Sequence, residues 1–186
     1  MKNYLLILLI SSLLISCEKR EYLDTEYGKF TEYIIEKDNH YCNGKHIECL
    51  NTPYLYQEFM LDSSCLYDLS YQTGWNKLTG FVSDLNDTRT NSIRVGWRPD
   101  GTDKFELSAY YHVTSDKKPI IHKLYTIYPN QIGWIECKWS NGYYIVNICG
   151  VIDSCKQDNK PQVMFMNYPY FGGDKDAPKT MKIYLK

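Results

Sequence analysis

Apolar and polar residues alternate along two neighbouring segments of the sequence, and this period of two constrains the fold more than any other feature. In residues 91–98, the apolar residues at positions 93, 95 and 97 are separated by polar residues or glycine. In residues 103–114, the residues at odd positions from 105 to 113 are apolar in the same way. Because successive side chains of a strand point to opposite faces, the pattern predicts two β-strands that each bury one face.

We expect these two segments to pair as an antiparallel hairpin with a five-residue loop, residues 98–102. In that register Trp97 faces Asp103 and Arg94 faces Glu106, and all apolar side chains share the core face. The opposite face is either a solvated surface or a ligand-binding surface, and the sequence leaves both interpretations open. This face carries polar, basic and aromatic groups: Ser92, Arg94, Ser108, Tyr110 and His112.

Short alternating segments recur along the rest of the chain, and no helix-length segment shows apolar residues at helical spacing. Tyrosine, which favours strands, contributes 18 of the 186 residues. The hydrophobic content of 44% excludes a disordered chain. We therefore predict an all-β domain over residues 31–186, an antiparallel two-sheet sandwich of jelly-roll type. The predicted strands are 32–37, 54–61, 76–83, 91–98, 103–114, 120–127, 132–140, 143–149, 162–169 and 179–185.

The amino-terminal residues indicate export. Lys2 is followed by an apolar run over residues 4–15, which is shorter than the about 20 residues that span a bilayer. Such a run is typical of a secretory signal peptide, and its end, Leu-Ile-Ser-Cys, resembles the lipobox of bacterial lipoproteins. The resemblance implies removal of residues 1–16 and attachment of a diacylglycerol to Cys17. An ordinary signal peptide or a short buried helix is the alternative.

A lipid on Cys17 would make the bilayer a partner of this protein, with residues 17–30 as a charged tether. The expected location is the bacterial cell envelope, with the outer membrane as the favoured membrane. Nothing later in the sequence is apolar enough to span a bilayer.

Six of the seven cysteines follow the lipobox, and an even number in an exported chain suggests disulfides. We expect a local disulfide between Cys42 and Cys49, because an Asn-Gly turn lies between them. The hairpin expected at Asn141-Gly142 places Cys137 and Cys149 on opposite faces, which excludes a bridge between that pair. The cysteines and histidines lack the spacing of zinc ligands.

The charge balance and the motif content exclude several classes of function. With 21 Lys and Arg against 22 Asp and Glu, the chain lacks the basic excess of a nucleic-acid binder. No Gly-rich phosphate loop, nucleophile elbow or His-Glu-x-x-His motif occurs. Glycoside hydrolysis needs two positioned carboxylates, and Glu106 and Glu136 are isolated acids in their strands. The sequence identifies no catalytic residue, and binding is favoured over catalysis.

Carbohydrate binding needs exposed Tyr or Trp rings beside side chains that bond sugar hydroxyls, and the chain is rich in both. The alternative is that these rings fill the core. The oxygen-rich segments 172–176 and 84–87 resemble calcium-binding loops, although plain turns have similar sequences. The candidate ligand-binding residues come from the predicted polar face and from one loop: Arg94, Tyr110, His112, Tyr168, Tyr170 and Asp174.

Three segments resemble a family of exported bacterial proteins, many of them lipoproteins, that has no assigned activity. They are residues 76–81 (NKLTGF), 91–98 (NSIRVGWR) and 168–178 (YPYFGGDKDAP). The resemblance extends from about residue 34 to residue 185 and implies export and a concanavalin-like jelly-roll sandwich. It implies no reaction. The run 87–90 lacks the histidine that the family often carries beside the Asn-Ser segment.

We therefore expect a lipid-anchored envelope protein with a binding role and with a carbohydrate as its candidate ligand. Two alternatives remain open. One is a polysaccharide-cleaving enzyme, either a lyase or a glycosidase, for which Arg94, Tyr110 and His112 supply the residue types of a lyase. The other is a purely structural envelope component.

Overall fold

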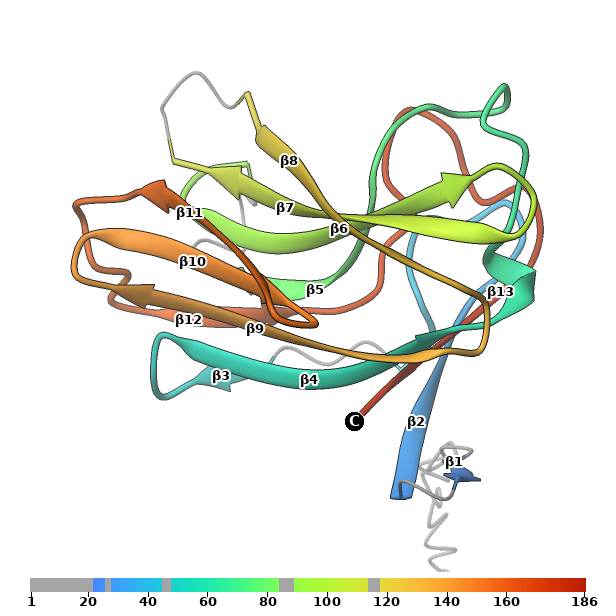
Figure 1. The fold of residues 1–186 in the computed structure, drawn as a ribbon, viewed down its shortest axis with the longest axis horizontal. Helices are drawn as coiled ribbons and strands as arrows, with labels where there is room; N and C mark the ends of the chain where they lie inside the picture. The colour runs from blue at the N-terminus through green and yellow to red at the C-terminus, as the bar shows by residue number, and fades with distance from the viewer. Residues whose placement is uncertain (1–21, 26–27, 45–47, 84–88, 114–117) are drawn as a thin grey trace, which may run out of the picture.

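The computed structural model describes residues 22–25, 28–44, 48–83, 89–113 and 118–186. The expected signal peptide, the lipidation site Cys17 and the candidate calcium ligands at 84–87 lie outside the described residues. Nearly all regular structure is β-strand, and one turn of 3-10 helix, η1 (Ser63–Cys65), follows β4 (Figure 1). The strands are β1 (Tyr22–Thr25), β2 (Gly28–Ile35), β3 (Cys49–Leu50), β4 (Tyr54–Leu61), β5 (Asn76–Val82), β6 (Ser92–Asp100), β7 (Lys104–His112), β8 (Ile120–Ile127), β9 (Ile132–Ser140), β10 (Tyr143–Ile148), β11 (Val151–Lys156), β12 (Met164–Asn167) and β13 (Met181–Leu185).

The strands form two sheets that pack face to face (Figure 1). The seven-stranded sheet has the order β1-β2-β13-β4-β9-β10-β11, and the six-stranded sheet has the order β3-β12-β5-β6-β7-β8. The strand pairs of the described chain all run antiparallel. Neighbours such as β2 and β13 are distant in sequence, as in a jelly roll. The predicted all-β sandwich of jelly-roll type is confirmed.

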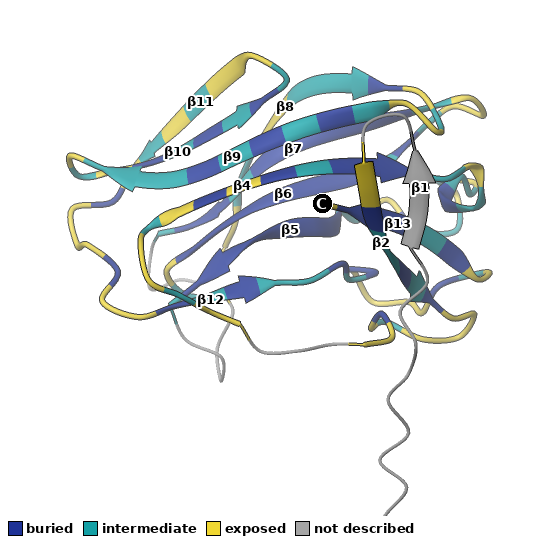
Figure 2. Cartoon of the chain, turned by 90° about the horizontal axis from the view of Figure 1, so that it is seen from below, coloured by how far each residue is buried: buried dark blue, intermediate teal, exposed yellow. Residues whose placement is uncertain are grey.

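The β6–β7 hairpin buries the face that carries its apolar residues, as the alternation of apolar and polar residues predicts. Its odd-numbered residues face the seven-stranded sheet, and Figure 2 shows β5 and β6 as buried along most of their length. Burying a large aliphatic or aromatic side chain contributes roughly 1.5–3 kcal/mol, which fixes the face of each strand. The fully buried residues of the hairpin are Ile93, Val95, Trp97, Phe105, Leu107, Ala109 and Tyr111.

The register of this hairpin differs from the prediction. Arg98, not Arg94, faces Glu106, because β6 continues to Asp100 and β7 begins at Lys104, so that only residues 101–103 form the loop. Gly101 has a φ of 76°, a left-handed conformation that lets the chain reverse in a shorter loop. The shift moves each partner by an even number of residues, so every side chain keeps its predicted face.

The hairpin expected at Asn141-Gly142 forms in its predicted register, with Cys137 facing Val146. The next strand, β11, is absent from the prediction. Its side chains are exposed or half-buried, so no apolar stripe marks it in the sequence. Its turn is also unusual, because Cys149 and Gly150, with φ of 51° and 94°, repeat the geometry of an Asn-Gly turn with cysteine in the asparagine position.

The predicted Cys42–Cys49 disulfide is not formed, and no disulfide joins any of the six described cysteines. The two residues belong to different parts of the sandwich. Cys42 is buried in the core, where its backbone pairs with Ile35 at the end of β2. Cys49 is exposed on β3, at the edge of the other sheet. An Asn-Gly sequence between two cysteines therefore does not bring their side chains together here.

The seven-stranded sheet begins inside the segment that the sequence assigns to the tether. β1 pairs with the first residues of β2, and Phe30 is fully buried against Met60 and Tyr184 in a small second apolar cluster. Among the residues that the structure describes, no helix is long and apolar enough to cross a membrane.

Candidate ligand-binding site

The face of the six-stranded sheet that points away from the core carries a cluster of basic and aromatic side chains. Arg94 on β6 pairs with Tyr110 on β7, and His112 follows two residues later on β7. Lys77 enters from β5, where it pairs with Gly96. The Lys77 Nζ lies 4.0 Å from the centre of the Tyr110 ring, and the Arg94 Cζ lies 5.3 Å from it. The rings of Tyr110 and His112 are 5.5 Å apart. We call Lys77, Arg94, Tyr110 and His112 the basic cluster.

The side chains of the basic cluster are recessed. Lys77 is 7% exposed, Arg94 is 6% exposed and His112 is 3% exposed. Ser92 and Ser108 on the same face are fully buried. The interpretation of this face as a solvated surface therefore does not hold. Removing cations from water costs free energy unless a partner compensates their charge, so a recessed basic cluster is expected to have a specific role.

Lys77 is the most perturbed group of the cluster. Burial, together with repulsion from Arg94, lowers the pKa of Lys77 to about 7. Its ammonium group donates a hydrogen bond of 2.6 Å to the Trp75 carbonyl and contacts the face of Tyr110. Lys77 forms no ion pair with any of the described residues. This position is therefore suited to an anionic group of a ligand, which would favour the protonated amine.

Arg94 and Tyr110 complement Lys77. Burial lowers the pKa of Arg94 to about 10, while Tyr110 and Tyr170 act in the opposite direction, so Arg94 stays protonated at neutral pH. Burial raises the pKa of Tyr110, against the opposing effect of Arg94, so its phenol also stays protonated. The cluster thus combines a permanent cation, a titratable amine and a hydroxyl donor.

Tyr170 extends the site along the edge of β5. Its backbone N–H donates to the Lys77 carbonyl at 2.9 Å, and its own carbonyl accepts from the Lys77 N–H at 2.8 Å. The His40 ring stacks on Tyr170 with centroids 5.5 Å apart, and the edge of Tyr41 meets Tyr170 at 5.2 Å. The Asp176 carboxylate orients His40, since its Oδ1 lies 3.1 Å from the His40 Nε2. We call His40, Tyr41 and Tyr170 the aromatic rim, and its outermost ring, Tyr41, is 52% exposed.

Two glycines allow the close packing that positions the cations. Gly80 of β5 has a φ of 141°, and an added Cβ would lie 2.6 Å from the Arg94 Cα on β6. An added Cβ at Gly172 would lie 3.2 Å from the Lys77 Nζ. Larger residues at either position would therefore displace the strand or the side chain that carries a cation.

The carboxylates on this face are already paired. Arg98 binds Glu106 through both Nε and Nη2 at 2.8 Å, and Lys123 also pairs with Glu106. Burial alone would raise the pKa of Glu106, but hydrogen bonds from Lys123 and Arg98 lower it. Asp100 pairs with Lys104 at 3.5 Å and with Lys123 at 3.8 Å. Glu106 therefore lacks the raised pKa that a general acid for glycoside hydrolysis needs.

The structure brings together four of the residues selected from the sequence, which are Arg94, Tyr110, His112 and Tyr170. It does not bring the other two to this site. The Tyr168 ring packs 5.7 Å from Tyr33, and its hydroxyl donates to the Glu48 carboxylate at 3.1 Å. Asp174 is exposed on the loop that follows the aromatic rim.

Sequence reasoning misses Lys77, although the predicted strand 76–83 contains it. Strict alternation counted back from Phe81 places Lys77 on the core face. A β-bulge between Lys77 and Thr79 reverses this assignment and turns the lysine to the polar face. The one signal in the sequence is a lysine within a strand whose neighbours are apolar, small or polar without charge.

No group of three or more His, Cys, Asp or Glu residues within the described ranges is placed to hold a metal ion. In the segment 172–176, which the sequence offers as a calcium-binding loop, Asp176 instead pairs with His40.

Neither a family model nor a curated protein sequence matches this chain. Solved structures with a similar fold include an alginate lyase from Klebsiella pneumoniae, with a TM-score of 0.64, 8% identity and coverage of 88% of this chain and 81% of that one. A PL7 alginate lyase from Zobellia galactanivorans has a TM-score of 0.55, 11% identity and coverage of 87% and 76%. A glycoside hydrolase family 16 endo-glucanase from Bacteroides ovatus has a TM-score of 0.53, 9% identity and coverage of 89% and 82%. At these identities the similarity concerns the fold, a concanavalin-like jelly roll.

Proposed function

We propose that this protein binds a glycan that carries carboxylate groups, and that the basic cluster is the binding site. The observation that carries the proposal is Lys77, a recessed amine without an ion-pair partner among the described residues and next to Arg94. A ligand carboxylate placed here would accept charge-assisted hydrogen bonds from both side chains. Those bonds would offset the cost of burying the two positive charges.

The aromatic rim supports a carbohydrate rather than a small acid. Sugar rings stack their C–H faces on aromatic side chains, and Tyr41 offers an exposed ring beside the recessed cations. The similarity of the fold to alginate lyases and to an endo-glucanase supports the same class of ligand.

The test is calorimetric titration of the full-length protein with an oligogalacturonate and with an alginate oligosaccharide. We expect binding that weakens about tenfold or more in Lys77→Met and in Arg94→Met, because each removes a charged donor to the carboxylate. Lys104→Met is the matched control, since Lys104 lies on the same sheet but pairs with Asp100 outside the cluster. Equal affinity in the wild type and in both cluster variants would contradict the proposal.

A second candidate is cleavage of the same glycan by β-elimination. Two observations favour it: the pKa of Lys77 is about 7, and the Lys77 Nζ lies 4.0 Å from the centre of the Tyr110 ring. The neutral Lys77 amine would take the proton from the carbon next to the carboxylate, and Arg94 would stabilise the charge that develops there. The electron pair would form a C=C bond as the bond to the glycosidic oxygen breaks, and Tyr110 would give that oxygen a proton. Ultraviolet absorbance of the new double bond tests this candidate, and it should disappear in Lys77→Met.

We also propose that the chain is held in the bacterial cell envelope, at the outer membrane, by a lipid on Cys17. The apolar run over residues 4–15 and the lipobox-like sequence that ends at Cys17 support this location.

A further inference from the structure

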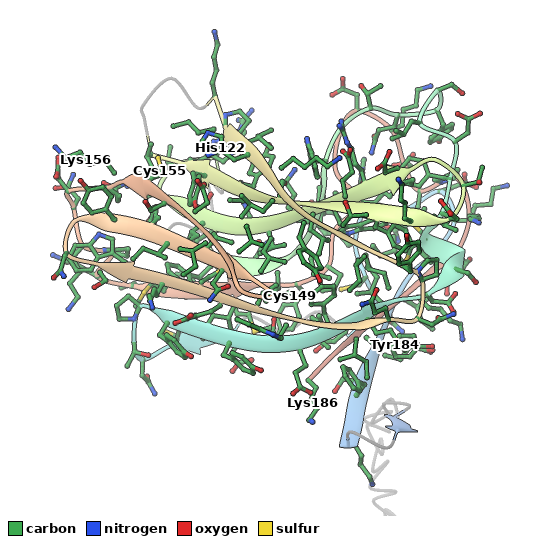
Figure 3. The ribbon with its side chains drawn as sticks, viewed as in Figure 1. His122, Cys149, Cys155, Lys156, Tyr184 and Lys186 are labelled. Carbon is green, nitrogen blue, oxygen red and sulfur yellow. The ribbon has the colours of Figure 1, made fainter. Side chains whose placement is uncertain are left out.

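A cavity of about 450 Å³ opens where β2, β4 and β12 approach one another, and none of its lining residues belongs to the basic cluster or to the aromatic rim. Lys186, which directly follows β13 and is labelled in Figure 3, is one of its lining residues. Its walls combine tyrosine rings with a few polar groups, as ligand-binding cavities commonly do. The residues that matter for its chemistry are Tyr33, Glu48, Tyr56, Gln57, Tyr168 and Lys186.

The aromatic side of the cavity is held in place by ring contacts. The Tyr33 and Tyr168 rings lie 5.7 Å apart with an angle of 38° between their planes. Tyr56 stacks on Trp134 with centroids 6.2 Å apart and an angle of 25°, and it remains 48% exposed. These rings are therefore oriented before any ligand arrives, which lowers the entropic cost of stacking a planar or ring-shaped ligand on them.

The polar side of the cavity contains an acceptor that lacks a donor. Gln57 is 9% exposed, and its Oε1 accepts no hydrogen bond from any described residue. A buried amide oxygen without a donor costs free energy. Gln57 lines the cavity, so a hydroxyl group of a ligand bound there is a possible donor to this oxygen. Nearby, the Glu48 carboxylate accepts from the Tyr168 hydroxyl and has further acceptor capacity.

The charges at the cavity disfavour ionic ligands of either sign. Glu48 repels a carboxylate or phosphate, and the Lys186 ammonium, which pairs with Glu58 at 3.0 Å, repels an amine. Hydroxyl groups have no such conflict, because each one can donate to an oxygen or accept from an ammonium. We propose that this cavity binds an uncharged sugar residue, which stacks on the tyrosine rings and donates hydroxyl hydrogens to Gln57 and Glu48. This site is independent of the carboxylate-binding site proposed above.

The test is an NMR titration of the full-length protein with the neutral tetrasaccharides cellotetraose, xylotetraose and mannotetraose. We expect at least one to bind and its affinity to fall about tenfold in Tyr56→Ala and in Gln57→Leu, through loss of stacking and of an acceptor. Tyr143→Ala is the matched control, because Tyr143 is 43% exposed on β10 and does not line the cavity. Tyr56 is about half exposed, so its variant keeps the test valid if the Gln57 variant folds poorly.

Three results would overturn the inference. They are no binding of any tetrasaccharide, equal affinity in the wild type and both cavity variants, or loss of binding in Lys77→Met alone, which would place the neutral sugar at the basic cluster. The two sites are separable, because failure of uronate oligosaccharides to bind, with intact tetrasaccharide binding, would contradict only the proposed function. Loss of tetrasaccharide binding in the cavity variants, with uronate binding unchanged, is the result that supports both sites.

Discussion

A single amine, Lys77, has the strongest chemical consequences at the scale of the residue. It lies within a strand whose residues are all buried, and a bulge turns it away from the apolar core toward Arg94 and Tyr110. The folded protein therefore holds an amine where the charged form is disfavoured. Such a residue costs stability, and its retention is readily explained if it acts on a ligand.

Replacing Lys77 by methionine should stabilise the protein at neutral pH. The pKa of Lys77 is about 7 when folded and 10.5 when exposed, so the unfolded chain binds more protons between these values. Wild-type stability should therefore rise as the pH rises through this window, and Lys77→Met should lack that rise. Each pKa unit corresponds to about 1.4 kcal/mol, so we expect the variant to be more stable at pH 7 by at least that amount.

Urea unfolding at a series of pH values between 7 and 10.5 measures this difference. Lys104→Met serves as the control for removal of a lysine from the same sheet. Parallel stability profiles for the wild type and Lys77→Met would show that Lys77 titrates normally in the folded protein.

At the scale of the element, a strand is easier to predict from the sequence when the turn beside it has a recognisable sequence. The turn at Asn141-Gly142 and the turn at Cys149-Gly150 have nearly the same φ values, but only the first has a recognisable sequence. Cysteine at a positive φ is strained relative to asparagine, which adopts this conformation more readily. The sequence therefore does not predict β11, the strand that follows Cys149, although β11 forms one edge of the seven-stranded sheet.

Cys149→Asn should stabilise the β10–β11 hairpin by about 0.5–1 kcal/mol, because asparagine is preferred at the first position of this turn. Thermal or urea unfolding would measure the gain. Cys149→Ser controls for removal of the thiol, which contacts the Trp134 backbone at 3.4 and 3.5 Å. A destabilised asparagine variant beside an unchanged serine variant would show that the turn does not limit stability.

The sequence predicts most of the fold and about half of the candidate site, and the reasons are local. Strands 54–61, 120–127 and 132–140 form with their predicted bounds, because alternation and flanking turn residues agree there. Arg94 and Tyr110 are predicted correctly because the error in the hairpin register is an even number of residues, which leaves each side chain on its predicted face. Lys77 is missed because a bulge reverses alternation without changing composition. Tyr168 and Asp174 are misplaced because alternation does not determine the path of a loop.

At the scale of the whole molecule, side-chain contacts connect the two sheets where their edge strands approach each other. β8 ends one sheet and β11 ends the other. The buried Tyr111 donates to the Asp153 carboxylate at 3.0 Å, and the His122 Nδ1 lies 2.9 Å from the same oxygen. Asp153 on β11 of the seven-stranded sheet therefore contacts two residues of the six-stranded sheet. Burial and this carboxylate raise the pKa of Tyr111. Figure 3 shows His122 on β8, beside the end of β11.

Asp153→Ala should destabilise the protein by about 1–3 kcal/mol, because it leaves the buried Tyr111 hydroxyl without its acceptor. His122→Ala should cost less, since the His122 side chain is half exposed. Urea unfolding of both variants tests this order. A larger loss in His122→Ala than in Asp153→Ala would contradict the assignment of Asp153 as the link between the sheets.

Cys17→Ser should move the protein from the membrane fraction to the soluble fraction of a bacterial host if Cys17 carries the lipid. The physical reason is that two acyl chains are enough for stable anchoring, whereas the described sandwich has no membrane-spanning helix of its own. Fractionation followed by immunoblotting measures the shift, and Cys49→Ser, at an exposed thiol, is the control. Membrane retention of the Cys17 variant would exclude lipidation at this residue as the anchor.

The position of β13 has a consequence for how the protein is made. This strand, residues 181–185, is the last described strand to leave the ribosome, yet it lies between β2 and β4 inside the seven-stranded sheet. Lys182 reaches back 150 positions to pair with Glu32. Until β13 has been synthesised, β2 and β4 each lack one neighbour and present an open edge. This sheet can therefore be completed only after β13 has emerged from the ribosome, and a nascent chain must be kept from pairing with other nascent chains until that strand is inserted.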